Sequence, residues 1–258
     1  MIPKIIHYCW FGGEKPDSVL QFIEGWRKKC PDYEIKEWNE NNFDINEAKF
    51  ARESYAAKKW AFVSDYVRFA VLEQYGGIYL DTDIELLKSL DSMQKEPGYV
   101  GFEVHGVAAG VIACEAHNPI IRAVLETYQR TAFINKDGTY NLLTSPDYIS
   151  NELVKVGFVR ENIEQHLKGM TVYPSEWFYP YTLVSFQTNI TENTVAIHHY
   201  AGSWLDEKSK YQLGIQKKLK WIPVKRLAIW ISVAISETKY NGVKGLLYVV
   251  SNRLRRTR

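Results

Sequence analysis

The stretch SDYVRFAVLEQYGGIYLDTDIE, residues 64–85, contains the pattern that decides the fold. Its apolar residues recur at helical spacing, which predicts one helix over residues 54–75 that stops at the glycine pair 76–77. Residues 78–80 predict a short buried strand, and the acidic pair of residues 81–83 follows directly. Because open α/β sheets bind ligands at the carboxyl ends of their strands, this order predicts an α/β fold with a ligand site at the acidic pair.

Strands and helices alternate along the rest of the chain as well. Residues 2–8 form an apolar, β-branched run, residues 16–29 have helical spacing, and residues 33–38 alternate as a strand does. A strand, a helix and a strand in succession indicate a mainly parallel central sheet. Further strands are predicted over residues 99–104, 107–113, 170–173 and 194–198, and helices over residues 119–130 and 146–156.

Charge is distributed unevenly between the body of the chain and its end. Residues 207–258 contain 13 Lys or Arg against two acidic residues, a net of +11, so the total of +2 leaves −9 for residues 1–206. We expect one α/β domain over residues 1–206 and an extension of basic amphipathic helices over residues 207–258. The partner expected for the extension is an anionic membrane surface rather than nucleic acid. Its apolar stretches are too short to span a bilayer.

The compartment is indicated by the cysteines and the amino terminus. The three cysteines lack the CxxC spacing of zinc and redox sites, which fits a reducing compartment. The chain begins without the basic and apolar segments of a signal peptide. We therefore expect a cytoplasmic protein, peripheral on the inner face of the cell membrane.

Asp81 and Asp83 are the first candidates for chemistry. Residues two apart on a strand point to the same side, and the turn that follows can bring both carboxylates to one cation. Oxygen ligands suit Mg²⁺ or Mn²⁺, and such an ion neutralises the diphosphate that leaves an activated sugar. The alternative is that both carboxylates only cap backbone N–H groups of a turn.

Three segments together resemble a known enzyme family. Residues 64–85, the opening IPKIIHYCWFGG of residues 2–13 and HHYAGSW of residues 198–204 are similar to glycosyltransferase family 32 and to the glucosyltransferase domains of the large clostridial toxins. The resemblance implies the GT-A fold, which is a single Rossmann-like domain. It also implies transfer of a hexose from a nucleotide diphosphate sugar with retention of anomeric configuration.

The resemblance assigns roles around the acidic pair. Asp65 and Arg68 match a pair near the donor hexose, and their i, i+3 spacing puts both on one face of a helix. Asp81 matches a carboxylate that contacts ribose, donor sugar and metal, and Asp83 matches the direct metal ligand. Tyr79 stands where the family has an aromatic beside the sugar. The alternatives are a surface ion pair for Asp65 and Arg68 and simple core packing for Tyr79.

The opening segment is expected to bind the nucleotide. Trp10 matches an aromatic that stacks on the base, a contact worth about 1–3 kcal/mol. Ile6 and His7 precede it and are expected to offer backbone groups to the edge of the base. For His7 the alternative is a core histidine whose hydrogen bonds are satisfied.

The closing segment is expected to complete the metal site. His199 resembles the histidine that fills the third metal position in related retaining enzymes. His198 would point the other way on a strand and is expected to be structural. Ser203 and Trp204 match a loop whose hydroxyl and indole N–H donate to the diphosphate, with packing as the alternative for Trp204.

The substrates follow only from the resemblance. UDP-galactose or UDP-glucose is the first choice of donor and GDP-mannose the second. The family's usual glycine is replaced at residues 144–146, near where the donor or acceptor lies. The expected acceptor is a glycan, lipid-linked, in capsular or surface polysaccharide synthesis. The alternatives are a non-catalytic sugar-nucleotide or membrane-surface binding protein of the same fold, and a DxD phosphotransferase, which Glu85 disfavours because a Thr is normal there.

Overall fold

The computed structural model divides the chain into two compact units. The sheet unit comprises Met1–Tyr181 and Thr188–Tyr200, and the helical unit comprises Thr182–Gln187 and Ala201–Arg258. Each is described by itself. The residues that the structure describes are 1–104, 106–181, 188–202, 207–219, 221–222 and 224–256.

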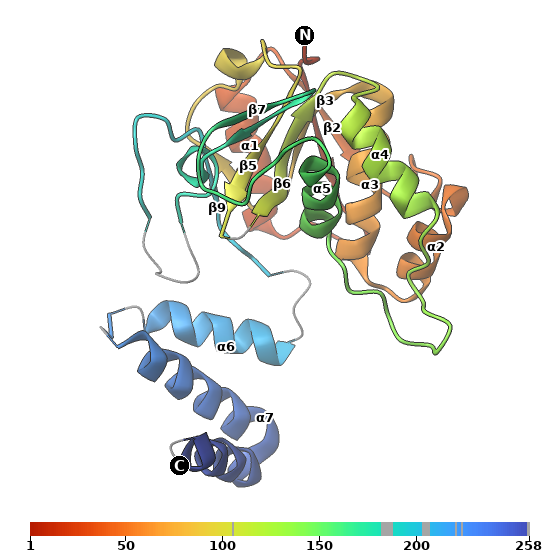
Figure 1. Cartoon of the computed structure of the whole chain (residues 1–258). Coiled ribbons are helices and arrows are strands. Elements are labelled where there is room, and N and C mark those ends of the chain that lie inside the picture. The colour runs from red at the N-terminus through yellow and green to blue at the C-terminus, as the bar shows by residue number, and fades with distance from the viewer. Residues whose placement is uncertain (105, 182–187, 203–206, 220, 223, 257–258) are drawn as a thin grey trace. The chain divides into compact units, whose positions relative to one another are not determined.

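The sheet unit is built on a seven-stranded sheet with the order β2-β1-β3-β6-β5-β8-β7 (Figure 1). Five strands run in one direction, while β6 and β7 run against their neighbours. This confirms the predicted α/β class with a mainly parallel sheet. The strands are β1 (Ile5–Cys9), β2 (Glu34–Trp38), β3 (Gly77–Leu80), β5 (Gly98–Glu103), β6 (Gly106–Cys114), β7 (Gln165–Leu167) and β8 (Met170–Tyr173).

Helices cover both faces of the sheet because strand residues alternate between them. Ile78 and Leu80 of β3 pack into the core on the α1 side, whereas Tyr79 faces the core formed with α2 to α5. Trp26 of α1 is fully buried and donates from its indole nitrogen to the carbonyl of Ile84, at 2.7 Å. The helices are α1 (Asp17–Lys29), α2 (Lys49–Ala56), α3 (Trp60–Tyr75), α4 (Pro119–Gln129) and α5 (Ser145–Val154), with 3-10 turns η1 (Ile45–Glu47), η2 (Asp91–Met93) and η3 (Ser175–Trp177).

The glycine pair between α3 and β3 has the conformation that its residue type predicts. Gly76 and Gly77 have φ angles of 62° and 100°, where a side chain is strained. A Cβ at Gly76 would also lie 2.5 Å from the backbone nitrogen of Ala116. Only glycine therefore lets the chain leave α3 and enter the middle of the sheet at this point.

The prediction of one helix over residues 54–75 is wrong. The structure has α2 and α3 there, separated at Lys58, whose φ of 55° is left-handed. Lysine gives no sequence signal for that conformation, since glycine and asparagine are the residues that favour it.

A two-stranded ribbon connects distant parts of the sequence. β4 (Ile84–Leu86) pairs antiparallel with β9 (Ala196–His198), so that Ile84 lies opposite His198. Asp83 directly precedes β4. The ribbon therefore brings the end of the sheet unit to the acidic turn.

The helical unit contains α6 (Glu207–Lys218) and α7 (Lys225–Arg256), and α7 is interrupted at Gly242, with a φ of 63°. The two helices are tied by an ion pair between Lys208 and Glu237, at 2.7 Å, and by a bond from the Tyr240 hydroxyl to the Glu207 carbonyl, at 3.1 Å. Within the described ranges, no helix combines the length and apolarity that crossing a bilayer requires.

Candidate metal and donor site

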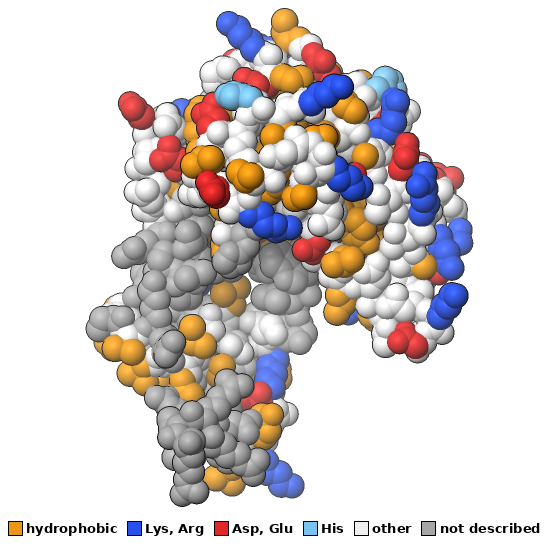
Figure 2. Space-filling view, viewed as in Figure 1, with side chains coloured by type: hydrophobic (Ala, Val, Ile, Leu, Met, Phe, Trp, Pro, Cys, Tyr) orange, Lys and Arg blue, Asp and Glu red, His pale blue; other side chains and the backbone are white. Residues whose placement is uncertain are grey.

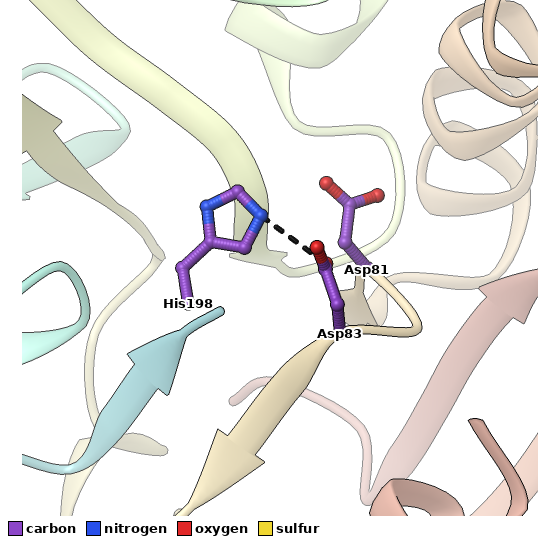
Figure 3. Close-up of side chains that lie close together, drawn as sticks. All are labelled: Asp81, Asp83 and His198. Atoms are coloured by element: carbon purple, nitrogen blue, oxygen red, sulfur yellow. Dashed lines mark ion pairs between the residues drawn. The ribbon is translucent and has the colours of Figure 1, made fainter. Parts of the chain in front are cut away.

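The acidic turn lies between the end of β3 and the start of β4. The backbone nitrogen of Asp81 donates to the carbonyl of Gly110 on β6, at 2.8 Å, and the nitrogen of Ile84 donates back to the carbonyl of Asp81, at 3.0 Å. These bonds end β3 and fold the chain sharply. Asp83 is thereby released from strand alternation, and both carboxylates face one point, as the sequence predicts (Figure 3).

Asp81, Asp83 and His198 form a group that could hold a metal ion. One ligand atom from each lies within 4.8 Å of the others. The Nε2 of His198 is 3.1 Å from Oδ1 of Asp83 (Figure 3). Two ligands at right angles on an ion with ligand distances near 2.1 Å lie about 3 Å apart, so this separation fits a shared cation.

His198 is held firmly and is electrostatically coupled to the turn. Its side chain is nearly buried, and its ring lies 4.0 Å from that of Tyr200, whose hydroxyl bonds to Glu103. Burial opposes the charged imidazole, but the hydrogen bond and the negative charge of Asp83 outweigh it and raise the pKa of His198. The Nδ1 of His198 is buried, and within the described part of the chain it has no hydrogen-bond partner.

The expectation for the two histidines is reversed in the structure. His199, expected as the third ligand, turns away and its Nε2 lies 2.8 Å from Oε2 of Glu85, while its ring packs on Phe22. His198, expected to be structural, faces Asp83 instead. The reason is the register of the ribbon: Ile84 lies opposite His198, so His199 shares the other face with Glu85.

Asp65 and Arg68 form a buried ion pair rather than a surface one. The Nη2 of Arg68 lies 2.8 Å from Oδ1 of Asp65, and its Nη1 lies 3.3 Å from Oδ1 of Asp81. The guanidinium also donates to the carbonyl of Ala109, at 2.7 Å. Burial opposes its charge, but Asp81 and Asp65 raise the pKa of Arg68, which keeps a fixed positive charge behind the metal group.

Tyr79 is buried behind Asp81 instead of lining a sugar site. Its side chain is 1% exposed, its hydroxyl donates to Oδ1 of Asp81 at 3.1 Å, and the Arg68 guanidinium lies over its ring at 4.5 Å. Arg68 and Tyr79 together hold Oδ1 of Asp81. The sequence alternative of core packing is therefore closer to the structure, with the addition that Tyr79 orients a site carboxylate.

Ile6 and His7 also lie in the core rather than at the surface of a nucleotide site. Both are fully buried, and their backbones pair with β2 and β3 on the two sides of β1. The ring of His7 lies 2.8 Å from the Gly76 carbonyl through Nε2 and accepts from the indole nitrogen of Trp38, at 3.0 Å, through Nδ1. Burial lowers the pKa of His7 to about 4. His7 is a satisfied core histidine, and a contact from either residue to a base has no support in this geometry.

Trp10, Ser203 and Trp204 are the remaining residues that the sequence predicts for the site. Trp10 is half-buried after β1, and its indole nitrogen donates to the Gly13 carbonyl, at 2.8 Å. Ser203 and Trp204 lie outside the described residues.

Two contacts of the site have no counterpart among the sequence predictions. Ser145, at the start of α5, donates from its hydroxyl to Oδ1 of Asp65, at 2.6 Å, and from its backbone nitrogen to Oδ2, at 3.3 Å. Gly110 leaves room for Asp81, because a Cβ there would lie 3.1 Å from Oδ2. Thr144 and Asp147 form a capping box, a pattern that predicts the start of a helix but not its contact with Asp65.

Residues 16–99 match a family described as a glycosyltransferase sugar-binding region containing a DXD motif. The chain is 30% identical over 141 residues to inositol phosphoceramide mannosyltransferase 3 of Schizosaccharomyces pombe, which covers 51% of this chain and 38% of the relative. It is 24% identical over 217 residues to subversion of eukaryotic traffic protein A of Legionella pneumophila, which covers 63% of this chain and 33% of the relative.

The chain thus spans between a third and two fifths of the length of these relatives. The solved PaToxG glycosyltransferase aligns with a TM-score of 0.48 and 23% identity over 60% of this chain and 68% of that one. The matched segment contains the Asp65–Arg68 pair and the turn with Asp81 and Asp83. Residues 16–99 are thus similar to the glycosyltransferase sugar-binding region that contains the DXD motif.

Proposed function

We propose that the protein is a metal-dependent glycosyltransferase that moves a hexose from a nucleotide diphosphate sugar to a glycan acceptor. One observation carries this proposal. Asp81, Asp83 and His198 converge within 4.8 Å at the end of β3, and a buried guanidinium stands directly behind Asp81. The match of residues 16–99, which include Asp81 and Asp83, to the DXD-containing sugar-binding region supports it.

Asp83 and His198 would hold the ion, and Asp81 would complete its protein ligands. Two carboxylates and one imidazole suit Mn²⁺ better than Mg²⁺, which prefers oxygen ligands alone. A bound ion supplies positive charge where the leaving diphosphate becomes more negative. Arg68 fixes the orientation of Asp81, so that its Oδ2, beside Gly110, is presented in one direction.

The donor sugar is proposed to lie next to Asp65, Arg68 and Asp81. Of the three side chains, Asp81 is 28% exposed, whereas Arg68 and Asp65 are 6% and 10% exposed. Asp81 therefore makes the main contact, and the buried pair meets only the hydroxyl that reaches furthest in. We propose retention of configuration, as the resemblance implies. Nuclear magnetic resonance of the product's anomeric proton tests it.

The proposal also names a nucleotide and an acceptor. Trp10 stacks on the base, and Ser203 and Trp204 donate to the diphosphate. UDP-galactose or UDP-glucose is the proposed donor, with GDP-mannose second. The S. pombe relative is named a mannosyltransferase of inositol phosphoceramide, which favours testing GDP-mannose and a lipid-linked acceptor alongside the UDP sugars.

A donor panel is the experiment that tests the activity. The full chain is incubated with Mn²⁺ and each sugar nucleotide, and release of the nucleotide diphosphate is measured. We expect release from one class of donor and its loss in Asp83→Ala. If no donor turns over, or if Asp83→Ala keeps full turnover, the proposed function is wrong.

The helical unit is proposed to bind an anionic membrane at the inner face of the cell membrane. Trp221, Val243 and Leu247 expose 75%, 70% and 62% of their surface. Trp221 lies between α6 and α7, whereas Val243 and Leu247 lie on α7 together with Lys239 and Lys244. Exposed apolar side chains and lysines on one helix are typical of helices that lie on a bilayer. We also propose that residues 1–206 are the catalytic part of the chain and that residues 207–258 are its basic extension.

A further inference from the structure

Residues 131–144 of the sheet unit form a loop between α4 and α5 (Figure 1). The loop exposes the apolar side chains of Leu142 and Leu143. The loop is anchored at Phe133, which is fully buried with its ring 5.0 Å from that of Phe62. Tyr140 stacks on Phe133 at 5.0 Å, and Ile134 and Tyr140 form a β-bridge. The base of this loop, called here the α4–α5 loop, is therefore fixed by core contacts.

Two adjacent leucines follow the bridge and face solvent. Leu142 is 67% exposed and Leu143 is 51% exposed. Asn141 before them donates to the Tyr148 hydroxyl, at 3.0 Å, and Thr144 after them belongs to the capping box of α5. Because both ends are held by specific bonds, the two side chains are kept in water by the fold itself. Such a surface is typical of an interaction site.

The charge around the α4–α5 loop is opposite to that of its unit. Residues 49–59 and 131–144 contain five Lys or Arg and two acidic residues, a net of +3, within a segment 1–206 whose net charge is −9. Both stretches are in contact: the Ile134 nitrogen donates to Glu53, at 2.9 Å, and the Lys59 ammonium lies over the Tyr140 ring, at 5.8 Å. Figure 2 shows blue and orange side chains side by side over this part of the sheet unit. The basic residues are exposed, and they are Lys49, Arg52, Lys58, Lys59 and Lys136.

We propose that the α4–α5 loop is a contact surface for an anionic lipid bilayer. Leu142 and Leu143 would enter the headgroup region, and the lysines of residues 49–59 and 131–144 would interact with the phosphates. Two exposed leucines on a loop that contacts a basic stretch match a bilayer whose surface is negative and whose interior is apolar. All residues of this surface belong to the sheet unit.

The contact also places the candidate site near the bilayer. Ser145, two residues beyond Leu143, donates to Asp65 of the site. Two residues of extended chain span about 7 Å, so the loop touches the bilayer close to the site. An acceptor held in the membrane would then reach the site without leaving the lipid surface; this last step alone rests on the proposed function.

A fluorescent probe at position 143 tests the proposal without any assay of activity. Cys9, Cys30 and Cys114 are all buried, so a cysteine introduced as Leu143→Cys can be labelled selectively with an environment-sensitive dye. We expect a blue shift and brighter emission with vesicles of phosphatidylglycerol and phosphatidylcholine, and much less change with phosphatidylcholine alone. The matched control is Leu20→Cys on α1, where the native leucine is 46% exposed. Its dye should not respond.

A charge variant tests the lysines independently. Lys59→Gln with Lys136→Gln should weaken vesicle binding, by about fivefold for each lysine. Lys168→Gln, also exposed, should leave vesicle binding unchanged.

Three outcomes would overturn the proposal. The first is an unchanged emission of the dye at position 143 while the protein sediments with anionic vesicles. The second is a dye that is already blue-shifted without lipid, because the chain itself covers the loop. The third is an equal change of emission with neutral and with anionic vesicles. Each of these results leaves the donor panel unaffected, so the two proposals fail separately.

Discussion

At the scale of single residues, the account depends on which histidine faces the acidic turn. His198 lies 3.1 Å from Asp83, whereas His199 pairs with Glu85 on the other side of the ribbon. We expect His198→Ala to lower Mn²⁺-dependent turnover at least about 100-fold, because a direct ligand is worth more than the outer-shell contacts that cost 10–100-fold. Steady-state kinetics against Mn²⁺ concentration measure the change.

The neighbouring histidine is the matched control for this experiment. His199→Ala removes an imidazole one residue away and should keep turnover within about threefold, since its ring faces Glu85 and Phe22 rather than Asp83. An equal loss in both variants, or a larger loss in His199→Ala, would show that the assignment of the third ligand is wrong.

His7 gives the protein a defined dependence of stability on pH. Its pKa is about 4 in the folded chain against an ordinary value of 6.5, so the unfolded chain binds the proton more readily between these values. The contribution of His7 to the free energy of unfolding is therefore fully present above about pH 6.5 and is lost as the pH falls toward about 4. Linkage gives a loss of about 2 kcal/mol from this group between about pH 7.5 and about pH 5.

Urea unfolding at several pH values measures this dependence. In His7→Gln the loss of unfolding free energy between about pH 7.5 and about pH 5 should be smaller by about 2 kcal/mol. His166→Gln, at an exposed position, should behave as the wild type. If His7→Gln keeps the full pH dependence of the wild type, groups other than His7 cause the loss of stability at low pH.

At the scale of secondary-structure elements, β6 supplies the space in which Asp81 sits. A Cβ at Gly110 would lie 3.1 Å from Oδ2 of Asp81 and 3.6 Å from a methyl carbon of Ile84. Gly110→Ala should leave the fold intact, because alanine is compatible with a strand, but displace Asp81. We expect a loss of Mn²⁺ affinity of about tenfold or more, measured by calorimetry.

The control for the glycine experiment lies on α1. A Cβ at Gly25 would meet nothing within 4 Å. Gly25→Ala should raise the free energy of unfolding by about 0.5–1 kcal/mol and leave Mn²⁺ binding unchanged. If Gly110→Ala binds Mn²⁺ as tightly as the wild type, the position of Asp81 is less constrained than the structure indicates.

The start of α5 fixes the other end of the same network. Ser145 supplies two donors to the buried carboxylate of Asp65. Ser145→Ala removes the stronger one and should destabilise the protein by about 1–3 kcal/mol, the cost of an unsatisfied buried acceptor. The exposed Ser18→Ala on α1 should cost little. Equal urea midpoints for the two variants would contradict the importance of this bond.

The elements also show which parts of the site a sequence can predict. Gly76 and Gly77 and the acidic turn were predictable because glycine conformation and strand ends are local properties. The choice between His198 and His199 was not, because it depends on the register of two three-residue strands that lie more than 100 residues apart in the chain. No sequence pattern predicts the contact of Ser145 with Asp65 either, because the two residues lie 80 positions apart in the chain.

At the scale of the whole molecule, binding to membranes and binding of the donor are expected to be separable. The chain forms two compact units, and the metal group lies entirely in the sheet unit. Deleting residues 208–258 should remove most of the sedimentation with anionic vesicles and leave nucleotide release largely intact. Sedimentation of the truncated chain equal to that of the full chain would refute the membrane role of the helical unit.

The central claim is that a divalent cation sits between Asp83 and His198 and holds the diphosphate of the donor. Anomalous diffraction from crystals soaked with Mn²⁺ and a nucleotide diphosphate tests it most directly. The account predicts one manganese peak within about 2.2 Å of both Oδ1 of Asp83 and Nε2 of His198, in contact with the diphosphate. An ordered nucleotide with no manganese peak between these two side chains would contradict it.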